Sequence, residues 1–118
     1  MSDLQDIRTA LRRFTAERDW QQFHSPKNLA MALAGETGEL VSLFQWLGEE
    51  ESRNLPAARL AEAADEIADV QMYLVALADQ LGIDIAQAVA GKMVKNAAKY
   101  PVDRFRGSAR KYDDPLED

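Results

Sequence analysis

Two pairs of acidic residues with the same spacing stand on neighbouring apolar segments of this chain. Glu36 and Glu39 interrupt the first segment within the stretch GETGEL, and Glu66 and Asp69 belong to the second. Side chains three residues apart on a helix project together, so each segment would present two carboxylates from one side. An unpaired buried carboxylate is unfavourable, so such a site requires protonation, a basic partner or a metal ion.

Helical geometry places Glu36 among the apolar side chains of its own segment. At about 100° per residue, Glu36 falls about 30° from the centre of the apolar stripe and Glu39 about 90° away, at its edge. Glu66 and Asp69 lie along the boundary of the stripe on the next helix, whereas Asp65 points away from it. Most Glu-x-x-Glu pairs are solvated helix surface, and that alternative applies here. The position of Glu36 and the repeat of the pattern on a second helix favour a site.

The ligand types in this acidic group indicate which metal it would bind. Oxygen-only ligands suit Mg²⁺ or Mn²⁺ better than Zn²⁺. Di-iron carboxylate proteins also bind metal inside helical bundles, but they use Glu-x-x-His pairs. The single histidine, His24, lies outside both acidic segments, and the chain has no cysteine. The residues therefore predict a Mg²⁺ site in which Mn²⁺ is a possible substitute.

A basic segment follows the acidic one, and half of the 14 Lys and Arg residues lie between positions 92 and 111. Lys92 and Asn96 lie on the same predicted helix face as the apolar residues before them. A helix face that changes from apolar to polar in this way suggests the lining of a pocket. Lys95 and Lys99 fit a pocket or a helix end in water equally well. Carboxylates followed by cations are what a Mg²⁺-bound polyphosphate requires.

Aromatic residues flank the predicted acidic site. Trp20 and His24 precede the first acidic helix, Trp46 stands near its end, and Tyr73 follows Asp69 by one turn. Aromatic rings can stack on a nucleobase. Packing in a core or in a dimer interface is the alternative for the tryptophans, and His24 would then only fix its loop.

The elements that must position these residues are all predicted to be helical. Apolar residues have helical spacing throughout, and no segment shows the strict alternation of apolar and polar residues that indicates a strand. We expect helices over residues 3–16, 26–47, 57–81 and 84–99, joined by short connections, with EEESRNLP as a polar loop. Ser2, Ser25 and Asp84 are the expected N-caps. The fold class predicted is an all-α four-helix bundle unit. If the second and third helices pack antiparallel, their acidic pairs converge.

Length and charge limit the other function classes. The chain has 118 residues, the size of one domain, and its net charge of −6 argues against a nucleic-acid or anionic-membrane partner. No apolar run approaches the roughly 20 residues of a membrane span. We expect a cytoplasmic protein with a helical domain over residues 1–100 and a tail over residues 101–118, which is a candidate for completing a substrate pocket.

With these residues in place, the sequence resembles the MazG-like nucleoside triphosphate pyrophosphohydrolases, nearest to their dCTP pyrophosphatase branch. The resemblance rests on ERDWQQFHSPKNLAMALAGETGELVSLFQW, DEIADVQMYLVALA and KMVKNAAKYP. The family pattern is Glu-x-x-Glu on one helix and Glu-x-x-Asp on the next. Vertebrate dCTP pyrophosphatases have a histidine where Leu11 stands, so cytosine selectivity is open here.

The resemblance implies an all-α, Mg²⁺-dependent homodimer or homotetramer with substrate pockets between chains. It implies metal binding by Glu36, Glu39, Glu66 and Asp69, with Glu36 or Glu39 assisting the attacking water. Its substrate-binding residues would be Trp20, His24, Trp46, Tyr73, Lys92, Asn96, Lys95 and Tyr100.

The predicted function is hydrolysis of a nucleoside triphosphate, dCTP or a modified dCTP, to the monophosphate and pyrophosphate, which clears the nucleotide pool. Hydrolysis of another dNTP or of a phosphoribosyl-nucleotide is one alternative. A helical nucleotide-binding or interaction module without catalysis is the other.

Overall fold

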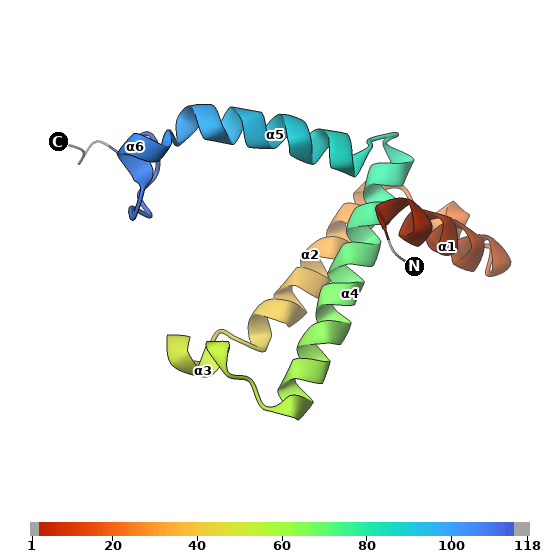
Figure 1. The fold of residues 1–118 in the computed structure, drawn as a ribbon. Coiled ribbons are helices and arrows are strands. Elements are labelled where there is room, and N and C mark those ends of the chain that lie inside the picture. Colours follow the sequence, from red (N-terminus) through yellow and green to blue (C-terminus); the bar gives the residue numbers. More distant parts are fainter. Residues whose placement is uncertain (1–2, 115–118) are drawn as a thin grey trace. The chain divides into compact units, whose positions relative to one another are not determined.

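The computed structural model describes residues 3–114, all of whose regular elements are helical (Figure 1). Residues 1–2, which include Ser2, and residues 115–118 lie outside the described part. The elements are α1 (Leu4–Glu17), the 3₁₀ turn η1 (Gln21–Phe23), α2 (Pro26–Ser42), α3 (Glu49–Arg53), α4 (Ala57–Gln80), α5 (Ile85–Lys99) and α6 (Val102–Phe105). The all-α expectation is confirmed.

Side-chain caps begin three of the longer helices. The backbone N–H of Asp6 donates to Asp3 Oδ1 at 2.8 Å, so Asp3 caps α1. Ser25 caps α2 and is followed by Pro26 at the first helical position, and Asp84 caps α5. A cap oxygen satisfies one of the amide groups that a helix start leaves unpaired. The predicted caps Ser25 and Asp84 are confirmed.

The second helix is shorter than the sequence predicts, ending at Ser42 rather than Leu47. The hydroxyl of Ser42 donates to the carbonyl oxygen of Glu39 at 2.7 Å, and this local bond competes with the helical pattern. Beyond it the N–H of Phe44 donates to Val41 O and the N–H of Leu47 to Phe44 O, so residues 43–47 form turns.

Two further short helices occupy segments predicted to be irregular. The expectation of a polar loop at EEESRNLP is wrong for Glu49–Arg53, which forms α3. The Glu51 side chain accepts a hydrogen bond from the N–H of Gly48 at 3.0 Å and so stabilises the start of this helix. The tail likewise contains α6, which begins directly after Pro101.

The chain forms two compact units, Met1–Ile83 and Asp84–Asp118. In the first unit α2 and α4 run side by side in opposite directions, and α1 crosses α4 (Figure 1). The predicted antiparallel pairing of the two acidic helices is therefore present. The fourth predicted helix, α5, belongs to the second unit together with α6. The predicted functional boundary between residues 100 and 101 stays a prediction.

The described residues bury few apolar side chains. Only Leu29, Ala63, Val75 and Ala78 are buried, and all belong to α2 or α4. Many large apolar side chains remain exposed, among them Leu60, Ile67, Met72 and Leu74 of α4 and Leu81 directly after it. No single described helix is long and apolar enough to cross a membrane, although α4 and α5 pass that test of length and composition if taken together as a broken pair.

Replacing Leu29 by alanine should destabilise the chain strongly, because Leu29 is 1% exposed and its removal leaves a cavity between packed helices. We expect a loss of roughly 2–5 kcal/mol in the free energy of unfolding. Urea denaturation followed by circular dichroism measures this loss. Met31→Ala, on the same helix but 64% exposed, is the matched control and should change stability much less. Equal losses for the two variants would contradict the packing described.

Candidate metal centre

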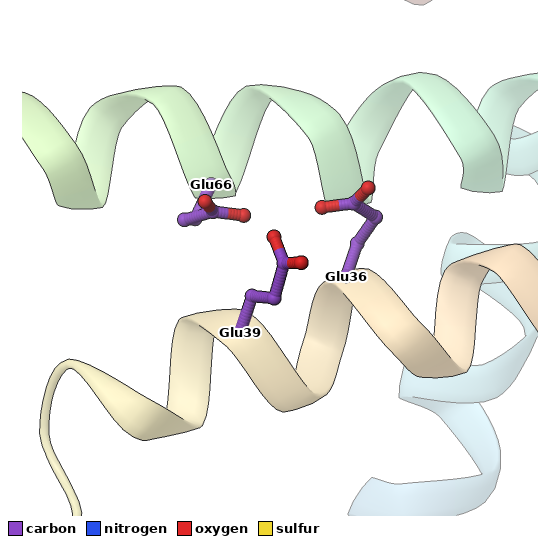
Figure 2. A group of neighbouring side chains, drawn as sticks. All are labelled: Glu36, Glu39 and Glu66. Carbon is purple, nitrogen blue, oxygen red and sulfur yellow. The ribbon is translucent and has the colours of Figure 1, made fainter.

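Three carboxylates converge between α2 and α4. Glu36 and Glu39 project from α2 toward Glu66 of α4 (Figure 2). Each side chain offers one carboxylate oxygen, and these oxygens all lie within 4.8 Å of one another. The structure thus brings together three of the four acids that the sequence singled out.

The fourth acid, Asp69, lies one helical turn beyond Glu66 on α4. It does not belong to the group within 4.8 Å. Its charge nevertheless raises the pKa of both Glu36 and Glu66, and it lines the same hollow as Glu36. Asp69 therefore borders the carboxylate group rather than completing it.

The protein provides little to neutralise this negative charge. Burial and the negative charge of Glu39 raise the pKa of Glu36 to about 7, and the same two causes raise the pKa of Glu66. One buried oxygen on each, Oε2 of Glu36 and Oε2 of Glu66, has no hydrogen-bond partner. Within residues 3–114 none of these acids forms an ion pair. Unpartnered oxygen ligands at this spacing fit a hard divalent cation such as Mg²⁺ or Mn²⁺.

An aromatic hollow of about 160 Å³ begins at the carboxylates. Glu36 and Asp69 form one part of its wall, and the predicted residues Trp20, His24 and Tyr73 line it as well. The Trp20 ring packs edge-on against Phe14, with ring centroids 5.7 Å apart. Leu11 contributes an apolar side chain to the same wall. Three predicted substrate-binding residues therefore share one hollow with two of the acids.

The remaining predicted residues are not placed in this hollow. Trp46 follows the end of α2 and is 87% exposed. The others, Lys92, Lys95, Asn96 and Tyr100, belong to the second unit. There the Tyr100 ring packs edge-on against Phe105 and Tyr112, with centroids 4.9 and 5.8 Å away. Their contribution to a site stays a prediction.

Sequence reasoning missed several residues beside the hollow. A second hollow of about 330 Å³ reaches Arg8, Gln21 and an ion pair between Arg12 and Asp79. In this pair Arg12 Nε donates to Asp79 Oδ2 at 2.8 Å, and a second guanidinium nitrogen donates to Oδ1. The partners are 67 residues apart in the chain, so no local pattern connects them. Phe14 was also missed as a residue of the hollow. The sequence feature that could have indicated it is its closeness to the aromatic residues that end at Phe23.

The chain is all-α, and its acidic residues face each other across two antiparallel helices. This is the arrangement that the resemblance to the MazG-like family implies. The model of the MazG-like family matches residues 32–114, and the chain belongs to that family.

Particular relatives make the likeness more specific. The chain is 50% identical to dCTP pyrophosphatase 1 of Mus musculus over 113 residues, which cover 94% of this chain and 66% of the relative. It is 47% identical to dCTP pyrophosphatase 1 of Homo sapiens over 111 residues, or 92% of this chain and 65% of the relative. The chain thus spans about two thirds of the length of these curated relatives.

A solved structure agrees with the fold. The crystal structure of a pyrophosphatase from Archaeoglobus fulgidus DSM 4304 superimposes with a TM-score of 0.78 at 40% sequence identity. The superposition covers 82% of this chain and 91% of the other.

The metal-free protein should lose thermal stability as the pH rises from about 5 to about 8. The pKa of Glu36 is about 7 in the folded chain, above the ordinary value of 4.5, so the folded state binds more protons than the unfolded state between these values. Stability then falls as the pH rises through this range. Melting temperatures by circular dichroism in the presence of a chelator measure the effect. Glu36→Gln should make the slope smaller, and the raised pKa of Glu66 should leave the remainder.

Asp65→Asn is the matched control, because Asp65 is an exposed acid next to Glu66, and it should keep the slope. The pKa of Asp79 is lowered by its hydrogen bond with Arg12, so its stabilising contribution is lost only as the pH falls below 3.8, outside this range. A melting temperature that rose or stayed constant from pH 5 to 8 would contradict the electrostatics described.

Proposed function

We propose that this protein hydrolyses a deoxynucleoside triphosphate, dCTP or a modified dCTP, to the monophosphate and pyrophosphate. The observation that carries the proposal is the group of three carboxylates without cationic partners at the edge of an aromatic hollow. The names of its relatives, dCTP pyrophosphatase 1 and an archaeal pyrophosphatase, support the same reaction. Its role would be to clear surplus or modified nucleotides from the precursor pool in the cytoplasm.

The acids would hold Mg²⁺, or Mn²⁺ as a substitute, through Glu36, Glu39 and Glu66, with Asp69 nearby. Such an ion supplies a Lewis acid for the phosphate oxygens and lowers the pKa of a bound water. Glu36 or Glu39 orients the attacking water and accepts its proton. The water oxygen forms a bond to the α phosphorus, the bond from that phosphorus to the oxygen that bridges the α and β phosphates breaks, and pyrophosphate leaves.

The aromatic hollow would bind the base. Trp20 and Tyr73 provide flat surfaces for stacking, and His24 provides ring nitrogens for hydrogen bonding. Lys92, Lys95, Asn96 and Tyr100 of the second unit would neutralise or contact the phosphates and sugar.

Apolar Leu11 in the wall of the hollow offers no hydrogen bond to a base. This observation keeps a second candidate open, hydrolysis of another dNTP or of a phosphoribosyl-nucleotide. With a net charge of −6 the protein is not expected to bind nucleic acid or membranes.

The protein would act as a homodimer or homotetramer. Leu60, Ile67 and Leu74 of α4 recur every seven residues, and Leu81 continues the repeat directly after the helix; all four are exposed in the single chain. A seven-residue apolar repeat is the pattern by which helices pair with other helices. Trp46, exposed at the end of the α2 segment, would contact substrate only in such an assembly.

Incubation with each of the dNTPs and Mg²⁺ should yield a monophosphate and pyrophosphate from at least one of them, as measured by ion-exchange chromatography. Glu39→Gln should lower kcat/KM by at least about a hundredfold at limiting Mg²⁺, because it removes a charged ligand of the ion. Asp65→Asn, a neighbouring exposed acid, should retain activity. The absence of turnover with any triphosphate would refute the enzymatic proposal, and full activity of Glu39→Gln would remove Glu39 from the metal site.

Sedimentation equilibrium should show a dimer or tetramer for the unmodified chain. Leu60→Glu should shift the equilibrium toward monomer, because it places a charge in the apolar repeat of α4. Ala61→Glu introduces the same charge one position along and should leave the assembly intact. Unchanged mass for Leu60→Glu would show that this face of α4 is not the interface.

A further inference from the structure

The two hollows of the first unit adjoin each other. They share five wall residues, Leu11, Thr15, His24, Leu29 and Ala76. Only the first hollow includes the acids Glu36 and Asp69, and only the second reaches Arg8, Asp79 and Gln80. A ligand held at the carboxylates and lying in the first hollow would therefore have the second hollow beyond it.

The second hollow carries an incompletely neutralised positive charge. Arg12 and Asp79 pair with each other, which leaves Arg8 as the additional cation. Arg8 is close enough to contribute to the lowered pKa of Asp79, but within residues 3–114 it forms no ion pair or hydrogen bond of its own. Its Nε atom is buried without a partner.

A buried donor without an acceptor is unfavourable, and buried polar groups are nearly always hydrogen-bonded. A guanidinium group that is half-buried beside an apolar wall would be satisfied by an oxygen acceptor or a carboxylate. The wall between the hollows consists of small or apolar side chains apart from His24 and Thr15, so it does not itself supply a carboxylate for Arg8.

We propose that the second hollow is a subsite for a substituent on the distal edge of the base, and that Arg8 binds an oxygen-bearing group there. The inference rests on the proposed function, since the reaction at the carboxylates orients the nucleotide. It assigns the substrate class as pyrimidine deoxynucleoside triphosphates whose ring carries a carboxyl or similar oxygen-containing group. Arg12 and Asp79 close the subsite by holding α1 against α4.

The test compares 5-carboxy-dCTP with 5-methyl-dCTP, which has an apolar substituent at the same ring position. We expect the protein to show a kcat/KM at least about tenfold higher for the carboxy compound, as a hydrogen bond to a charged group implies. Arg8→Met should abolish this preference. Arg8→Lys, which keeps the charge without the fork of donors, should retain part of it. Arg13→Met removes an exposed arginine from the same helix and should keep the full preference.

Binding of the two monophosphates without metal provides a readout independent of turnover, followed through tryptophan fluorescence because Trp20 lines the first hollow. The unmodified chain should bind 5-carboxy-dCMP more tightly than 5-methyl-dCMP, and Arg8→Met should bind them equally. Equal use of both triphosphates by the unmodified chain, or an unchanged preference in a folded Arg8→Met variant, overturns the subsite and leaves the hydrolase proposal standing. If no triphosphate is hydrolysed, the proposed function fails, and the comparison of the monophosphates still decides the subsite.

Discussion

Repulsion among carboxylates on α2 and α4 is the constraint on which the rest of the first unit depends. The packing of these helices holds oxygens of Glu36, Glu39 and Glu66 within 4.8 Å of one another, and no cationic side chain of the described chain pairs with them. Burial and the charge of Glu39 raise the pKa of Glu36 to about 7, so proton binding relieves part of the repulsion near neutral pH. A divalent cation would relieve more. Any such ligand of the folded state also stabilises the fold that binds it.

The same two helices, α2 and α4, also contain the few buried side chains of the chain's described part. Leu29, Ala63, Val75 and Ala78 are the buried apolar residues of the described chain, and all belong to α2 or α4. A domain with so little internal apolar burial has a narrow stability margin. The exposed seven-residue apolar repeat along α4 would supply additional burial if chains associate as proposed. In the proposed assembly the helix that holds Glu66 would thus also hold the chains together.

Local periodicity was sufficient to predict most of the fold and the acidic group. Helical spacing identified α1, α2, α4 and α5, and the i, i+3 acids could be paired because a short connection favours antiparallel neighbours. At the early end of α2 the Ser42 hydroxyl donates to the carbonyl oxygen of Glu39, a local bond that periodicity does not reveal. The Arg12–Asp79 pair joins α1 to α4 across 67 residues, and Trp46 is exposed beyond the end of α2. Tertiary contacts of this kind have no signal in a single sequence.

One uninterrupted helix, α4, carries both Glu66 at the carboxylate group and Asp79 at the wall of the second hollow. The two residues are thirteen positions apart, so at 1.5 Å of rise per residue the helix separates them by about 20 Å along its axis. An inserted or deleted residue in this interval would rotate one end by about 100° relative to the other. Substitutions between these two points keep the spacing and relative orientation of the carboxylate group and the second hollow, whereas a change in length within α4 would alter both.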